Sequence, residues 1–283
     1  MMKKYLIGFI DVIFSFSGQA AREFTDQLGR KVVIDDHVER VAVLQHQTLN
    51  LLVQLDATDK IVGVMGNWRE QLGQNYERLA PELVEVPNVG DLKSVNLESL
   101  VQLKPQVVFV TNYAPQEMID KITQVGIPVV AISLQKDNSS HAKNNVNPEL
   151  DNEEQAYNDG LKEGITLIGD IVNKPDNAKE LIKQTFDSRN IVTQRLKDIP
   201  ENQRVRAYMA NPDLTTYGSG KYTGLMMQHA GAMNVAAATI KGYKQVSLEQ
   251  VISWNPEVIF IQDRYPGVVD EINNDPSWQV IDA

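Results

Sequence analysis

The chain of 283 residues has no cysteine, no excess of positive charge and few aromatic residues. Without cysteine it forms neither disulfides nor thiolate metal sites, and it offers no thiol nucleophile and no N-terminal cysteine for a lipid anchor. Its 27 basic and 37 acidic residues give a formal net charge of −10, so no overall positive field attracts nucleic-acid phosphates. The hydrophobic content of 42% is typical of soluble globular proteins and excludes a disordered or multi-span membrane chain.

At roughly 150 residues per domain, the length favours two domains. Short β-branched runs alternate with helical patterns, and Pro105 and Pro128 each stand just before an expected strand, where a proline ends the preceding helix. This alternation predicts mostly parallel sheets covered by helices. Strands are expected at 41–44, 61–64, 107–111, 129–132, 205–210 and 258–261, and helices at 48–55, 96–103, 116–125, 152–173, 175–198, 222–231 and 248–254.

Residues 1–20 have the composition of a secretory signal peptide. Lys3 and Lys4 give a basic start, a mostly apolar run follows at 5–16, and residues 18–20 supply small side chains for a signal peptidase. A membrane anchor would need about 20 uninterrupted apolar residues, and this run is shorter. We therefore expect an exported, periplasmic protein.

The rest of the chain divides into two α/β lobes. An aperiodic stretch rich in Asn, Ser and Lys at 134–150 predicts a surface loop that closes the first lobe. The long helical pattern after this loop is expected to join the lobes rigidly. The predicted organisation is a signal peptide at 1–20, an N-terminal lobe at 21–150, a connecting helix at 151–173 and a C-terminal lobe at 174–283.

One segment occurs twice, once in each predicted lobe. Residues 95–110 align without gaps with residues 246–261, and Val, Leu, Glu, Pro, Val and Phe recur at the same places. Convergence on a helix, a proline stop and a buried strand explains the apolar matches but does not require the same glutamate twice. In each copy the residues after the strand lie at the carboxyl end of a parallel strand, where α/β folds bind ligands.

These features, with further stretches at 40–44, 60–64, 89–91, 126–129 and 231–235, resemble the class III substrate-binding proteins of ABC importers. That family carries iron-siderophores, haem, cobalamin and, in the branch most similar to this chain, oxyanions such as molybdate and tungstate. The resemblance implies two Rossmann-like α/β lobes, a rigid helix between them and a ligand cleft at their junction. Family members usually continue beyond a stretch like that at 278–283, so it also implies a truncated C-terminal lobe.

The resemblance further implies docking of a monomer onto an ABC permease dimer through one glutamate on each lobe. The matching positions are Glu98 and Glu249, each two residues after an expected Asn or Ser helix cap. A carboxylate in the first turn of a helix also stabilises that helix on its own. Its repetition on both lobes favours docking.

Polar and aromatic side chains gather at the expected strand ends that face the cleft. The first of these loops opens a helix whose free N–H groups can hold an anion, and an arginine follows the last expected strand. As a group these residues offer many hydrogen-bond donors and few carboxylates. We expect the ligand to contact Gln45, His46, Gln47, Asn67, Trp68, Tyr113, Tyr217, Ser219 and Arg264.

Two ligand classes fit these residues. A small oxyanion such as molybdate or tungstate suits neutral donors, helix N-termini and an arginine, whereas an iron-siderophore, haem or cobalamin would want aromatic walls or a Tyr or His axial ligand. Aromatic residues make up only 7% of the chain, which favours the oxyanion. The alternative from another class is an enzyme of nitrogenase-like fold, but the sequence has no Cys cluster, Gly-x-Ser-x-Gly or His-Glu-x-x-His motif. We expect a binding protein without catalytic residues, cofactor or side-chain metal ligands.

Overall fold

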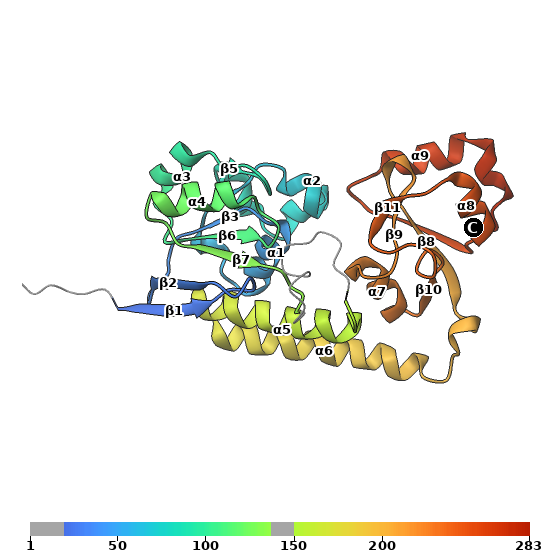
Figure 1. The fold of residues 1–283 in the computed structure, drawn as a ribbon, viewed down its shortest axis with the longest axis horizontal. Coiled ribbons are helices and arrows are strands. Elements are labelled where there is room, and N and C mark those ends of the chain that lie inside the picture. The colour runs from blue at the N-terminus through green and yellow to red at the C-terminus, as the bar shows by residue number, and fades with distance from the viewer. Residues whose placement is uncertain (1–19, 137–149) are drawn as a thin grey trace, which may run out of the picture.

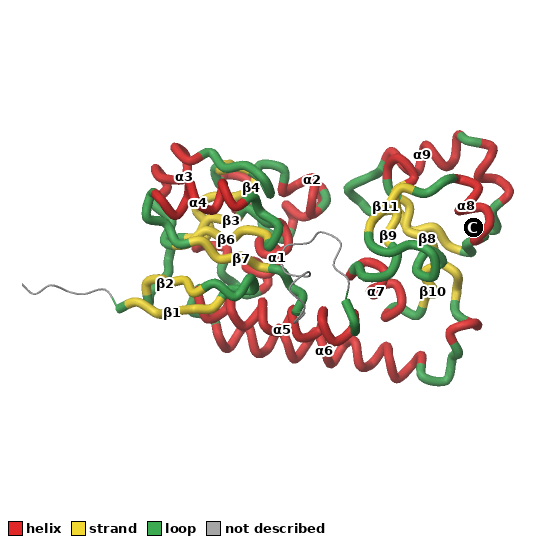
Figure 2. The backbone as a smooth tube through the Cα atoms, viewed as in Figure 1, coloured by secondary structure: helices red, strands yellow, loops and turns green. Residues whose placement is uncertain are grey.

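The computed structural model describes residues 20–136 and 150–283, which form two α/β lobes side by side along a pair of long helices (Figure 1). The expected signal peptide falls, apart from Ala20, outside the described residues, and so does most of the predicted loop at 134–150. In both lobes the helices lie outside the strands (Figure 2). Within the described ranges, no helix has the length and apolar character needed to cross a membrane.

A five-stranded parallel sheet forms the middle of the N-terminal lobe, with the strand order β5-β4-β3-β6-β7. The four strands predicted here are confirmed, and β5 is additional. The strands are β3 (Val41–Val43), β4 (Ile61–Met65), β5 (Asn88–Gly90), β6 (Val107–Thr111) and β7 (Val129–Ile132). The helices around them are α1 (His46–Gln54), α2 (Trp68–Leu72), α3 (Leu97–Leu103) and α4 (Gln116–Gln124).

Strand β6 illustrates how the apolar runs are buried on both faces of the sheet. All five of its residues are buried, as expected for a parallel strand covered on both faces. Val107 and Phe109 enter a core shared with α1, whereas Val108 and Val110 enter a second core shared with α3 and α4. Because the chain leaves β3 toward β4 and returns to its other side at β6, the loops after β3 and β6 flank a crevice suited to ligands.

A hairpin that the sequence pattern did not predict precedes this sheet. Strands β1 (Ala21–Thr25) and β2 (Lys31–Asp35) pair antiparallel. Asp26, which is 2% exposed, holds the turn by accepting hydrogen bonds from Arg30 and from the backbone N–H of Ala131 in β7. The hairpin is thereby attached to the edge of the main sheet.

The two lobes are connected by a pair of antiparallel helices, and the first of them occupies the range expected for the connecting helix at 151–173. Helix α5 (Glu153–Ile171) begins beside the C-terminal lobe, where the Tyr157 hydroxyl donates to the Gly220 carbonyl at 3.0 Å, and it ends in the core of the N-terminal lobe. Helix α6 (Pro175–Leu196), whose residues fall within the predicted C-terminal lobe at 174–283, runs back toward that lobe (Figure 1). A Cβ on Gly169 would lie 2.5 Å from the Ala178 Cβ, so glycine permits this close packing.

The C-terminal lobe contains a smaller parallel sheet with β8 in its middle, in the order β10-β8-β12. Its elements are β8 (Val205–Ala210), β10 (Ala232–Asn234), β12 (Val258–Ile261), the antiparallel pair β9 (Thr215–Tyr217) and β11 (Tyr243–Gln245), and the helices α7 (Tyr222–His229), α8 (Leu248–Trp254) and α9 (Gly267–Asn274). Short 3-10 helices occur in both lobes, at Thr58–Lys60, Gln74–Arg78 and Pro81–Glu85 in the N-terminal one and at Glu201–Gln203, Pro212–Leu214 and Pro276–Val280 in the C-terminal one. The predicted strands and helices of this lobe are confirmed to within two residues.

Candidate functional site

A cavity of about 510 Å³ lies between the two lobes. The N-terminal lobe contributes the ends of β3, β6 and β7, and the C-terminal lobe contributes β9, the start of α7 and the loop after β12. Three side chains that can carry positive charge line it: His46, Lys221 and Arg264. Among the described residues that line the cavity there is no Asp or Glu. Its electrostatics therefore suit an anion.

The start of helix α1 borders the cavity through His46 and Gln47. Gln45 at the N-cap is 3% exposed and uses its carboxamide internally, donating to the Ile132 carbonyl at 3.2 Å and accepting from the Thr48 hydroxyl. No side chain in the described structure caps the first turn, and no acidic residue lies in it. The free N–H groups and the helix dipole at this end favour a negative charge.

His46 presents a neutral ring at this helix end. Burial, and then the nearby positive charge of Arg264, lower the pKa of His46 to about 4. Its Nδ1 atom is buried and has no hydrogen-bond partner among the described residues. A neutral imidazole donates one hydrogen bond, so His46 can contribute a donor to an anion without carrying charge itself.

Arg264 lies in the loop after β12 and is held from both lobes. Its Nη1 donates to Gln71 Oε1 of the N-terminal lobe at 3.0 Å, and its Nη2 donates to the Tyr217 hydroxyl at 3.2 Å. The guanidinium carbon lies 4.9 Å from the centre of the Tyr265 ring. Its Nε atom is buried and has no hydrogen-bond partner within the described ranges. The positive charge is thus fixed in the cleft, and its Nε–H donor is unused.

The opposite wall carries an amine and several hydroxyl groups. Burial lowers the pKa of Lys221, which directly precedes α7. The rings of Tyr157 and Tyr222 lie 5.4 Å apart there, and burial raises the pKa of Tyr157 to about 12, so its hydroxyl stays protonated. Tyr113 lines the cavity from the loop after β6. This wall adds an amine, hydroxyl groups and aromatic surface to the cavity.

Six of the nine residues predicted to contact the ligand line the cavity: Gln45, His46, Gln47, Tyr113, Tyr217 and Arg264. Three do not. Trp68 is 2% exposed and packs edge-on to Tyr76 at 6.4 Å in the core of its lobe. Asn67 is the N-cap residue of α2, and the Ser219 hydroxyl donates to the Ile240 carbonyl at 3.3 Å beside a different, smaller hollow. A strand-end position does not by itself turn a side chain toward the cleft.

Sequence reasoning missed Gln71, Tyr157 and Gln262 as cavity residues. Gln71 lies in the short helix α2, one residue before its end, and Tyr157 reaches the cavity from the connecting hairpin. Neither position carries a sequence signal. Gln262 directly follows β12, and its Nε2 donates to Asn211 Oδ1 at 2.6 Å, so the rule that found Arg264 also applies to it.

The two predicted docking residues occupy equivalent places on the two lobes. Glu98 lies in the first turn of α3, where Asn96 caps the helix by accepting from the Ser99 N–H at 3.1 Å. Glu249 lies in the first turn of α8, between Ser247 and Gln250, which form a capping box. Both carboxylates are exposed, and neither lines the interlobe cavity.

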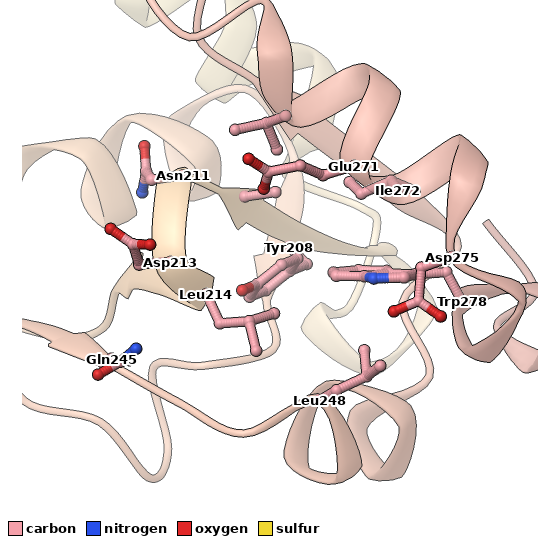
Figure 3. A pocket seen from close by; sticks show the side chains of 12 residues that line it. Tyr208, Asn211, Asp213, Leu214, Gln245, Leu248, Glu271, Ile272, Asp275 and Trp278 are labelled. Carbon is pink, nitrogen blue, oxygen red and sulfur yellow. The ribbon is translucent and has the colours of Figure 1, made fainter.

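A second hollow, of about 330 Å³, lies inside the C-terminal lobe (Figure 3). The Tyr208 and Trp278 rings flank it, with their centres 6.4 Å apart, and the carboxylates of Asp213, Glu271 and Asp275 surround it. None of the predicted ligand contacts lines it. Three carboxylates repel an anion, so the interlobe cavity is the better anion site.

Comparison with known proteins assigns the family. The sequence profile of the periplasmic binding proteins matches residues 41–283. The chain belongs to the periplasmic binding protein family. Members of this family bind ligands and do not turn them over, so the expected family, periplasmic location and lack of enzymatic activity are confirmed.

Individual periplasmic binding proteins refine the comparison. The chain is 60% identical to the molybdate-binding protein MolA of Haemophilus influenzae over 282 residues, which is 100% of this chain and 80% of MolA. The solved structure of MolA bound to molybdate matches with a TM-score of 0.89 at 62% identity, over 93% of this chain and 80% of that one. The haem-binding protein RhuT of Roseiflexus sp. RS-1 matches with a TM-score of 0.67 at 18% identity, over 87% and 86% of the two chains. The RhuT likeness concerns the fold alone, and the predicted two-lobed α/β fold is confirmed.

Proposed function

We propose that this periplasmic binding protein captures a tetrahedral oxyanion, molybdate or tungstate, between its lobes and delivers it to an ABC importer. The observation that carries the proposal is the charge of the interlobe cavity. Arg264 brings a positive charge to it, Lys221 and the neutral His46 line it as well, and no described carboxylate does. The 60% identity to a molybdate-binding protein supports the same ligand class.

Each part of the site has a role in this proposal. Arg264 supplies a permanent positive charge and charge-assisted hydrogen bonds, which are the strong ones for an oxyanion. The first turn of α1 supplies backbone N–H groups, and His46 supplies a ring N–H. Gln45 acts through its neighbours, because its carboxamide fixes the start of α1 against β7.

One observation favours a second ligand class, an organic chelate of iron or haem. A cavity of about 510 Å³ falls within the roughly 300–1,000 Å³ typical of sites for drug-sized ligands. A five-atom oxyanion fills on the order of 100 Å³, a few times the ~30 Å³ of a water. For the oxyanion we therefore expect ordered water, or a closer approach of the lobes, to take up the remaining space.

Delivery requires a partner on the membrane. We propose that Glu98 and Glu249 of a monomer each pair with basic residues of one half of a permease dimer. Their exposure, their equivalent first-turn positions and their separation from the cavity support this role. Light scattering of the purified protein tests the monomeric state, and a dimer would contradict this geometry.

The ligand class is tested on protein isolated from the periplasm without a denaturing step. Elemental analysis and native mass spectrometry identify what the cavity carries. We expect molybdenum or tungsten in about equimolar amount. Iron or a porphyrin in the same amount would show that the ligand is an organic chelate of iron or haem and not an oxyanion.

A further inference from the structure

The surroundings of His46 affect which ligand charge the cleft prefers. This inference rests on the proposed oxyanion function. The ring lies at the positive end of helix α1, and its buried Nδ1 has no hydrogen-bond partner among the described residues. Its neighbour Arg264 is itself held in place by Gln71 and Tyr217 and cannot easily swing away. In the empty cleft, these surroundings oppose a second positive charge on the ring.

An oxyanion between His46 and Arg264 would reverse this balance. Its negative charge offsets the guanidinium and favours the charged form of the ring. The imidazolium carries an N–H on each nitrogen, so it donates to a ligand oxygen whichever ring nitrogen faces the ligand. We propose that His46 takes up a proton when a dianion enters the cleft, which makes this residue a determinant of selectivity for dianionic over monoanionic tetrahedral ligands.

The direction of the pH dependence follows from linkage. Free His46 has a pKa of about 4, because burial and the Arg264 charge disfavour its charged form. A bound dianion raises that pKa. Oxyanion affinity therefore increases as pH falls below the pKa of His46 in the complex, and the gain stops once pH is below its pKa in the free protein. Uptake of one proton can change the affinity by at most about tenfold per pH unit.

Other groups that titrate or carry charge face the same cavity. A guanidinium carries a permanent positive charge, and burial raises the pKa of Tyr157 to about 12. The amine of Lys221 is the one other group with a lowered pKa, and burial is its cause. The titratable or charged side chains that line the cavity with His46 are Tyr113, Tyr157, Tyr217, Lys221, Tyr222 and Arg264.

The test compares two anions of the same shape and different charge. Molybdate, a dianion, and perrhenate, a monoanion, are titrated calorimetrically at pH 8, 7 and 6 in two buffers of different ionisation enthalpy. We expect molybdate affinity to rise several-fold across this range, with a buffer-dependent heat that reports proton uptake. Perrhenate affinity should stay flat.

His46→Gln keeps a side-chain donor but cannot take a proton, so the molybdate dependence should disappear. His229→Gln is the matched control, because His229 contacts Arg189 and Glu154 outside the cavity and should leave the dependence intact. The chain has four histidines, so NMR titration of the ring signals measures the His46 pKa directly in wild-type protein, whatever the stability of the variant.

Three results would overturn the inference: pH-independent molybdate affinity, a dependence that survives in His46→Gln, or an equal dependence for perrhenate. A different failure belongs to the proposed function. If no oxyanion binds at any pH, the oxyanion function is wrong and the role of His46 is lost with it.

Discussion

Arg264 of the C-terminal lobe and Gln71 of the N-terminal lobe are joined directly across the cleft by a hydrogen bond of 3.0 Å. The bond links residues 193 positions apart in the sequence. Tyr217 holds the same guanidinium from its own lobe at 3.2 Å. The strongest charge of the site is therefore placed by both lobes together, and ligand affinity should depend on residues of each.

Arg264→Ala should weaken molybdate binding about ten- to a hundredfold. Loss of a charge-assisted hydrogen bond costs roughly 1.5–3 kcal/mol, which corresponds to this range. The matched control is Arg69→Ala, because Arg69 stacks on Trp68 at 4.6 Å, pairs with Glu77 and does not line the cavity. Calorimetry measures the molybdate affinity of both variants. Equal affinities would show that Arg264 does not contact the ligand.

Gln71→Glu should abolish most of the oxyanion affinity. The new carboxylate would neutralise Arg264 and repel the ligand, so its effect should exceed that of Gln71→Ala, which only removes the positioning contact. Gln124→Glu adds the same charge at an exposed position at the end of α4, outside the hollows that Arg264 lines, and should change affinity little. Similar losses in Gln71→Glu and Gln124→Glu would point to a general charge effect and against the local pairing.

Reversing Glu98 or Glu249 to Arg should reduce transport while the affinity for the ligand stays unchanged. Both carboxylates are exposed, and neither lines the cavity. Glu180→Arg is the control, since Glu180 is exposed on α6, along the side of the molecule opposite to α3 (Figure 1). Uptake of labelled ligand into proteoliposomes with the cognate permease measures the effect. Normal uptake by both variants would exclude these residues from docking.

Gly169→Ala should destabilise the connecting hairpin. The added Cβ would lie 2.5 Å from the Ala178 Cβ, and overpacking of this kind costs about 1–3 kcal/mol. Gly267→Ala adds the same group where nothing lies within 4 Å, so it should leave stability unchanged or slightly raised. Urea unfolding of both variants gives the comparison. An equal midpoint for the two would show that α5 and α6 tolerate a wider separation.

The parts of the fold that the sequence predicted are those dictated by local pattern. Strands such as β6 and β8 are almost wholly apolar runs between prolines or polar turns, and the caps at Asn96 and Ser247 define where α3 and α8 begin. The hairpin β1–β2 was missed because its short strands are only partly buried. The direction of α6 depends on long-range packing, which no local pattern records.

The site was predictable as far as strand ends determine it. His46 and Arg264 follow β3 and β12 and reach the cavity as expected. Trp68 also follows a strand, yet its large apolar ring is buried in the core, where it removes more surface from water. Gln71 joins the site only because the two lobes face each other, which depends on the α5–α6 hairpin.

The most direct test of the proposed oxyanion function is a calorimetric titration of the wild-type protein with molybdate, tungstate, sulfate and a ferric hydroxamate under identical conditions. The cation-lined cavity predicts saturable binding of molybdate and tungstate at one site per chain, with Arg264→Ala weakening both, and no binding of the hydroxamate. Tight binding of the hydroxamate alone, with no heat from either oxyanion, would contradict it.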